Sequence, residues 1–273
     1  MSAVPVTAEG FGLRGPRGWA FRDVGFGAPP GALVAVEGPS GSGRTCLLLA
    51  LTGRMRPTEG RARVGEFELP RRSAAVRRIS GLGPVPGVND LEPALTVAEH
   101  LRERVHLEHR FGTSVRDLVA RRRRPDPVAP ALARAGLDLD ALPKGPRTPV
   151  RDLDRLEVLR LSVALALIGR PRLLAVDDAD QKLSDADRVL AWDLLRDVAA
   201  EETTVLAVCS EAPAGAVRVS TAAVAGTDGA EDGAERTGID TNADADAGAG
   251  AKTDTATDTE GEAADALAET GRA

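Results

Sequence analysis

The strongest chemical signal in the sequence is the stretch GPSGSGRT at positions 38–45. It fits the phosphate-loop pattern G-x-x-x-x-G-K-[ST] at every position but one, where Arg44 replaces lysine. Glycines in such a loop let backbone N–H groups converge on a phosphate, and the following helix N-terminus adds partial positive charge. The residues expected to bind a nucleotide are Gly38, Pro39, Ser40, Gly41, Ser42, Gly43, Arg44, Thr45 and Cys46.

The elements around this loop favour phosphate binding over an ordinary glycine-rich turn. The run Ala32–Val36 is short, apolar and β-branched, which is typical of a strand buried on both faces. The run Cys46–Leu51 behind the loop indicates a helix. The Thr45 hydroxyl is then placed to hold Mg²⁺.

Further strands and helices predict an α/β fold. Residues 8–26 are expected to form an antiparallel hairpin, and residues 61–64 and 79–85 to form strands. Residues 173–177, 204–208 and 217–224 are expected to be strands of the core sheet, and Ser184–Ala200 a helix with a Ser184/Asp187 capping box. The order implies a mixed sheet core joined to a helical subdomain.

The helical subdomain is expected at about residues 88–168. Val97, Leu101 and Val105 recur at the spacing of one helix face. Helical patterns continue over residues 115–123, 128–135 and 153–168, and the last of these is apolar enough to be buried.

Composition divides the chain into residues 1–225 and an acidic end. The 273-residue chain has 2 cysteines and a net charge of −6. Residues 226–273 contain 13 Asp or Glu and 3 Lys or Arg, and almost no large apolar residues. We expect this low-complexity tail to be disordered. No basic leader or apolar run of about 20 residues is present, so we expect a soluble, intracellular chain.

Over about residues 6–225 the chain resembles the ATP-binding subunit of an ABC transporter. Beyond the phosphate loop, four stretches carry the resemblance: LTGRMRPTEGRARV, LEPALTVAEHL, ALIGRPRLLAVDDA and TVLAVCSEA. The resemblance implies a P-loop NTPase fold. It also implies ATP and Mg²⁺ as ligands, a membrane-spanning partner and a homodimer or heterodimer.

The resemblance also assigns catalytic positions. Asp177 matches the aspartate that orients Mg²⁺, so the metal residues are Thr45 and Asp177. Asp178 replaces the glutamate that acts as base, and Ser210 replaces the switch histidine that contacts the γ-phosphate. Gly87 lies near the place of a glutamine that touches Mg²⁺ and water.

The signature position departs most from the family pattern. There LSGGQ is replaced by Leu153–Glu157, which reads LDRLE. Two carboxylates beside a partner's triphosphate are unfavourable, although the same residues also suit a well-capped helix start. We therefore expect ATP–Mg²⁺ binding with weak or absent hydrolysis. The alternatives are an active transporter ATPase and a nucleotide-independent regulatory or assembly module.

Other candidates carry weaker signals. Trp19 is expected either to stack on adenine or to pack in the core. His100, His106 and His109 share a helix, where an exposed polar face is favoured over a metal site. The run Arg121–Arg124 has no stacking aromatics, and we expect no nucleic-acid partner. The chain is expected to be cytoplasmic, and a peripheral location at the inner face of the cell membrane is compatible with this.

The composition of the tail predicts that it is dispensable for folding. Truncation after Ala225 is expected to shift the thermal unfolding midpoint by less than about 2 °C, because few apolar side chains are lost. Circular dichroism melts of the full and truncated chains measure this shift. A substantial drop in the midpoint would show that the tail packs on the body.

Overall fold

A computed structural model describes residues 2–111 and 126–221. The chain divides into two units, Met1–Ala225 and Gly226–Ala273, and every described residue belongs to the first. The acidic tail, the run Arg121–Arg124 and the helical pattern at 115–123 lie outside the described residues.

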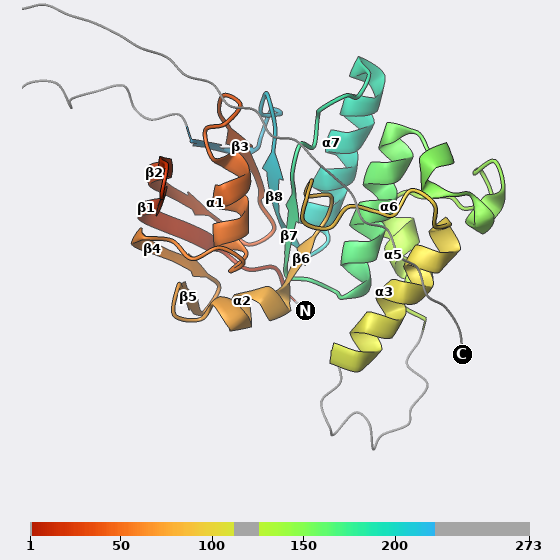
Figure 1. The fold of residues 1–273 in the computed structure, drawn as a ribbon, viewed down its shortest axis with the longest axis horizontal. Helices are drawn as coiled ribbons and strands as arrows, with labels where there is room; N and C mark the ends of the chain where they lie inside the picture. The colour runs from red at the N-terminus through yellow and green to blue at the C-terminus, as the bar shows by residue number, and fades with distance from the viewer. Residues whose placement is uncertain (1, 112–125, 222–273) are drawn as a thin grey trace, which may run out of the picture. The chain divides into compact units, whose positions relative to one another are not determined.

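An antiparallel sheet of four strands begins the fold (Figure 1). Its strands are β1 (Val6–Gly15), β2 (Gly18–Ala28), β4 (Glu59–Val64) and β5 (Phe67–Leu69), in the order β2-β1-β4-β5. Phe11 and Phe21 lie on its inner face, with ring centroids 5.8 Å apart. The predicted hairpin at 8–26 is therefore confirmed, with longer strands than expected.

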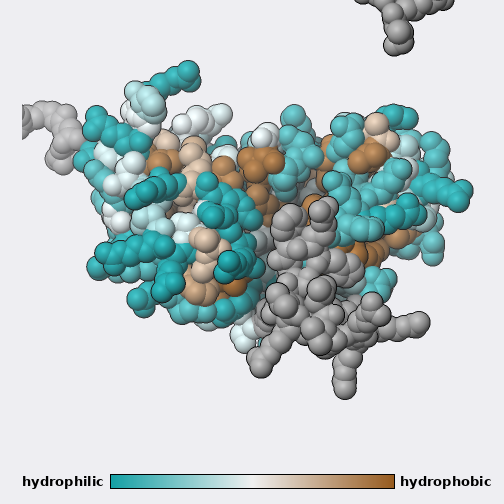
Figure 2. Space-filling model, turned by 60° about the horizontal axis from the view of Figure 1, so that its bottom comes forward, coloured by the Kyte–Doolittle hydropathy of each residue, from teal (hydrophilic) through white to brown (hydrophobic). Residues whose placement is uncertain are grey.

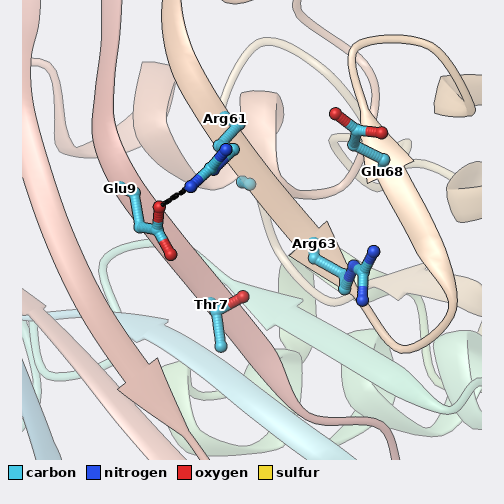
Figure 3. Close-up of a pocket in the computed structure, with 6 residues that line it drawn as sticks. Thr7, Glu9, Arg61, Arg63 and Glu68 are labelled. Carbon is cyan, nitrogen blue, oxygen red and sulfur yellow. Dashed lines mark hydrogen bonds and ion pairs between the residues drawn. The ribbon is translucent and has the colours of Figure 1, made fainter.

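The outer face of this sheet is polar. Arg61 on β4 faces Glu9 on β1, and Arg61 Nε donates to Glu9 Oε2 at 2.9 Å (Figure 3). Arg63 and Glu68 occupy paired positions on β4 and β5 beside them. The sheet thus turns one face to the core and the other to solvent, as antiparallel sheets commonly do.

The central sheet has five strands, all of them parallel. They are β6 (Ser80–Leu82), β7 (Leu173–Val176), β8 (Thr204–Val208), β3 (Leu33–Glu37) and β9 (Val217–Ser220), in that order. The expected parallel and antiparallel strands are both present, in two separate sheets. The carboxyl ends of parallel strands meet at one edge, so the residues after β3, β7 and β8 converge there.

Alternate residues of the central strands belong to two apolar cores. In β3, Val34 and Val36 pack in the core shared with the antiparallel sheet and helix α1 (Arg44–Leu51). Leu33 and Ala35 pack in the other core, shared with helices α6 (Arg155–Ile168) and α7 (Asp185–Ala200). Burial on both faces explains why these strands read as continuous apolar runs.

The helices between β6 and β7 match the predicted helical patterns. They are α3 (Val97–Phe111), α5 (Val128–Arg134) and α6, with short 3₁₀ turns at Gly145–Arg147 and Val150–Asp152. α6 buries nine of its residues, as its apolar sequence indicates. Its first residue, Arg155, lines a small pocket together with Pro84 and Asp178, which follow β6 and β7; Figure 1 shows α6 between α7 and α3.

Two elements were not expected from the sequence, one strand is shorter than expected, and one expected capping box is incomplete. Strand β5 and helix α2 (Ser73–Ile79) are short and weakly patterned, so periodicity does not reveal them. The strand expected over residues 79–85 is shorter in the structure, where β6 covers only Ser80–Leu82. At Ser184, the hydroxyl accepts the Asp187 N–H at 3.1 Å, but the Asp187 carboxylate accepts the Ser184 hydroxyl instead of completing a capping box.

Candidate functional site

The phosphate loop connects β3 to α1 in a tight, closed turn. The Ser42 N–H donates to Pro39 O at 3.1 Å. Gly43 has φ 82° and precedes the first residue of α1, and a Cβ there would collide with Ala20 O of β2. Only glycine satisfies both the left-handed backbone and this close approach.

The N-terminus of α1 has no cap from a side chain, and its first turn contains no acidic residue. The first N–H groups of a helix have no acceptor within the helix. Together with the helix dipole they form a site for an anion. The loop therefore has the geometry that the sequence predicts for phosphate binding.

A hydroxyl pair ties this loop to the end of β9. Ser42 Oγ and Thr221 Oγ1 are 2.6 Å apart, and Thr221 Oγ1 also donates to Glu37 O at 3.2 Å. Thr221 carries no motif in the sequence, and only the parallel pairing of β3 with β9 brings it here.

Thr45 and Asp177, the two predicted metal residues, are in direct contact. Thr45 Oγ1 donates to Asp177 Oδ2 at 2.6 Å, and the Asp178 N–H donates to Asp177 Oδ1 at 3.1 Å. Asp177 is only 3% exposed. Burial raises the pKa of its carboxyl, the charge of Asp178 raises it further, and the hydrogen bond from Thr45 acts in the opposite direction.

This oxygen pair fits Mg²⁺ better than a metal that prefers nitrogen or sulfur. Mg²⁺ is commonly held by one or two protein oxygens, with substrate phosphates and water completing the octahedron. Among residues 2–111 and 126–221, no group of three or more His, Cys, Asp or Glu side chains could hold a metal ion alone.

Arg44 is directed toward the end of β8. Its Nη1 donates to Cys209 O at 2.8 Å. A guanidinium is longer and broader than a lysine ammonium and holds its partners in a fixed plane. The charge expected at the outer phosphates is thus held against the backbone next to the switch position.

The segment around the switch position, residues 210–212, is held by two carboxylates. Asp180 accepts the Ser210 N–H at 2.9 Å through Oδ2 and at 3.1 Å through Oδ1, and the Glu211 N–H at 3.4 Å. Glu37 Oε1 accepts the Ala212 N–H at 2.6 Å. The sequence analysis missed Asp180; its place three residues after the acidic end of β7 was the available signal.

Asp178, at the position of the catalytic base, already has a partner. Its Oδ1 accepts Gln181 Nε2 at 2.8 Å, and its backbone has φ 49°, which is uncommon outside glycine. Gln181 is the only glutamine of the chain. It lies in the loop after β7 and contacts Asp178 from there. The glutamine that the family pattern has near Gly87 would instead lie before the helical segment.

The segment after β6 passes beside the metal pair, because Pro84 O accepts the Asp177 N–H at 2.8 Å. Gly87 lies in this segment, and its N–H donates to Asp90 Oδ2 at 2.7 Å. The segment thus occupies the expected place without a glutamine, and the amide of its Asn89 is bonded within the segment, to the Val85 N–H at 2.9 Å and to Gly83 O at 2.6 Å.

The residues LDRLE form the start of α6. Asp154 accepts the Glu157 N–H at 2.7 Å, and Glu157 accepts the Asp154 N–H at 2.8 Å, which completes a capping box. Asp154 is exposed and Glu157 is half-buried. The capped helix start that the sequence favours is confirmed, and it places two negative charges at this N-terminus.

Trp19 has cations over its ring. The guanidinium carbons of Arg14 and Arg22 lie 5.6 and 5.0 Å from the ring centroid. These cation–π contacts favour a packing role for Trp19 on β2.

The histidines do not share one exposed face. His100 is buried, contrary to expectation, with Nε2 3.2 Å from Glu92 O, whereas His106 is exposed. The side chain of His109 lies outside the described residues.

The two cysteines are poor nucleophiles. Burial raises the pKa of the Cys209 thiol to about 12, aided by Asp180 and Glu37. Burial and the charge of Asp177 raise the pKa of Cys46, in the first turn of α1. Both thiols are therefore protonated at neutral pH, and Cys46 can contribute to the phosphate site through its backbone N–H.

Comparison with known sequences identifies relatives of this chain. The model of the family described as ABC transporter matches residues 21–181. The Nod factor export ATP-binding protein I of Bradyrhizobium sp. (strain SNU001) is 32% identical over 184 residues, which are 67% of this chain and 55% of that protein. The ribose import ATP-binding protein RbsA 1 of Rhizobium johnstonii is 30% identical over 193 residues, 71% of this chain and 36% of that protein. The chain thus spans about half the length, or less, of these curated relatives.

Solved structures share the fold. A bacterial Atm1-family ABC exporter with ATP bound superposes with a TM-score of 0.57 at 21% identity, over 77% of this chain and 35% of that one. A dimeric ATP-binding cassette in a post-hydrolysis state with ADP and Pi bound superposes with a TM-score of 0.57 at 20% identity, over 76% of this chain and 88% of that one. In the part of this chain that the structure describes, no helix is long and apolar enough to cross a membrane.

Thr45→Ala is expected to weaken Mg²⁺-dependent nucleotide binding about tenfold or more, because it removes the hydroxyl that contacts Asp177. Isothermal titration with ATP, in Mg²⁺ and in chelator, measures the effect. Thr45→Ser keeps the hydroxyl and is the matched control. Equal affinity of all three proteins in both conditions would show that Thr45 takes no part in metal binding.

Proposed function

The chain belongs to the ABC transporter family, and from this premise we propose that it binds Mg²⁺–ATP at the phosphate loop and hydrolyses it slowly or not at all. We further propose that it acts at the inner face of the cell membrane with a membrane-spanning partner. Nucleotide binding, rather than rapid turnover, is then the signal it passes on.

One contrast between two helix N-termini carries this proposal. At α1 the first N–H groups have no side-chain cap, and the first turn of the helix contains no acidic residue, so they are available to the phosphates. At α6 the Asp154 and Glu157 side chains already accept backbone N–H groups and add negative charge. The structure therefore supports nucleotide binding at the start of α1. It does not support a contact between the start of α6 and the γ-phosphate of a nucleotide on a partner subunit.

Each of these residues would have a separate role toward a bound nucleotide. The loop amides bind and orient the phosphates, and Thr45 and Asp177 hold the metal. Mg²⁺, when bound, neutralises charge on the phosphate oxygens. Asp178 is the remaining carboxylate that could accept a proton from water, but it is a methylene shorter than glutamate and is bonded to Gln181.

Magnitudes favour weak turnover. Loss of one preorganised contact to a transition state commonly costs about 10²–10³ in rate, and contacts that act as a unit fail together. Here the base, the switch side chain and the signature all differ from the family pattern. Because both the loop side and the signature side are altered, pairing with a second copy would not restore either composite site.

An active transporter ATPase is the second candidate. It is favoured by relatives whose names include export and import ATP-binding proteins. A nucleotide-independent assembly module is the third, and it would show no ATP-dependent rise in thermal unfolding midpoint. ATP binding separates the third candidate from the others, and the turnover rate separates the first two.

Stepwise repair tests the proposal. Arg44→Lys is expected to tighten ATP binding, because a compact charge replaces the guanidinium held at Cys209 O. Adding Asp178→Glu and Ser210→His is expected to leave phosphate release near background. Turnover should rise only when Asp154→Ser, Arg155→Gly, Leu156→Gly and Glu157→Gln are added, because the two carboxylates and the bulk of Arg155 and Leu156 are then removed from the signature position.

Asp154→Asn with Glu157→Gln, in the same repaired background, is the matched control. This control removes both carboxylates but keeps the bulk of Arg155 and Leu156, so no gain in turnover is expected. Thermal unfolding of every variant shows whether it is folded. Family-like turnover from Arg44→Lys alone would refute the role assigned to the signature position.

A further inference from the structure

A basic pocket of about 400 Å³ lies far from the phosphate loop, at the other end of the central sheet. Its lining includes Arg54, Arg77, Arg78, Ser80, Arg104 and Glu108. Arg54 follows the C-terminus of α1, whereas the phosphate loop precedes its N-terminus. Ser80 begins β6, so the pocket lies at the amino-terminal edge of the parallel strands. Figure 1 shows α2 and α3, which supply most of its charges, on either side of β6.

The pocket carries an excess of positive charge. Four guanidinium groups line it together with one carboxylate, that of Glu108. Glu108 Oε1 pairs with Arg104 Nη2 at 2.6 Å, which offsets a single charge. Within the residues that the structure describes, the side chain of Arg78 has no hydrogen bond or ion pair. Arg77 and Arg78 are exposed, so the pocket is open to solvent.

Neutral acceptors hold three of the four guanidinium groups in place. Arg54 Nη1 donates to Thr52 O at 3.0 Å and to Ser80 Oγ at 2.8 Å. Arg77 Nη1 donates to Gly53 O at 2.7 Å, and Arg104 Nε donates to Leu165 O at 3.0 Å. These bonds fix the positions of the cations without neutralising them, so the cluster is preorganised for an anion.

Arg54 is in the least favourable electrostatic position of the four. Burial, together with the nearby charges of Arg77 and Arg104, lowers the pKa of its guanidinium to about 10. The group is still protonated at neutral pH. An anion in the pocket would therefore relieve repulsion that the folded chain otherwise bears.

We propose that this pocket is a second anion site, which binds a small compound with two or more phosphate groups. The planar donor fork of arginine matches phosphate oxygens, and a ligand with two or three negative charges balances the excess. Among the described residues that line the pocket none is aromatic, so they offer no platform for stacking a base. The face that comes forward in Figure 2 is largely hydrophilic where side chains other than the grey ones are visible.

Inorganic pyrophosphate is the probe, titrated into the full chain without Mg²⁺ and at constant ionic strength. The phosphate loop is blocked first with Gly41→Asp, which places a carboxylate where a Cβ has open space and where aspartate tolerates the left-handed backbone. The blocked protein is expected to keep one pyrophosphate site. Arg77→Gln with Arg78→Gln should weaken that site about tenfold or more, because two charged donors are lost.

Arg71→Gln with Arg72→Gln is the matched control, since it removes a neighbouring pair of exposed arginines that do not line the pocket. Its effect is expected to stay within about twofold. If Gly41→Asp does not fold, the wild-type chain is used, and two pyrophosphate sites should fall to one in the Arg77/Arg78 variant. The proposal would be overturned if the folded Gly41→Asp protein bound no pyrophosphate, or if the two arginine pairs weakened binding equally. In the wild-type background, it would be overturned by a single pyrophosphate site that Arg77→Gln with Arg78→Gln leaves unchanged.

Discussion

A helix N-terminus can hold an anion only while its first N–H groups and its partial positive charge are not already satisfied. This constraint separates two helices of one chain. The start of α1 is left open because Gly43, forced into the left-handed region beside Ala20 O, provides no capping side chain. The start of α6 is closed by the reciprocal bonds of Asp154 and Glu157. Stability favours the second arrangement, since a cap contributes about 1 kcal/mol, whereas binding an anion requires that the terminus stay open.

The remaining polar contacts of the site follow the same pattern, in which groups suited to act on a γ-phosphate are instead used within the chain. Arg44 holds Cys209 O, Asp180 and Glu37 hold the three amides that follow it, and Asp178 holds Gln181. The loop after β8 is therefore fastened to both the phosphate loop and the end of β7. Such a network suits a segment whose position reports nucleotide binding. It is less suited to a segment that must rearrange during each turnover.

The sequence predicts most of this architecture because its strongest signals are local. The apolar runs of β3, β7 and β8, the glycines of the phosphate loop and the apolar α6 each stand out in a short window. The Thr45–Asp177 contact was also predictable. Thr45 follows the phosphate loop after β3 and Asp177 directly follows β7, and the carboxyl ends of parallel strands meet at one edge of the sheet. Asp180 and Thr221 were not, because their partners are backbone groups or hydroxyls 30 to 184 positions away. The separation of the antiparallel strands into their own sheet depends likewise on long-range pairing, and α2 and β5 are too short to show a period.

The central claim is that binding and hydrolysis are uncoupled in this chain, and ATP binding and phosphate release measured on one sample of the purified full chain test it most directly. We predict saturable, Mg²⁺-dependent ATP binding, together with phosphate release indistinguishable from a no-protein control. Phosphate release at about 1 s⁻¹ or faster, within the ordinary range of enzymes, would contradict the account.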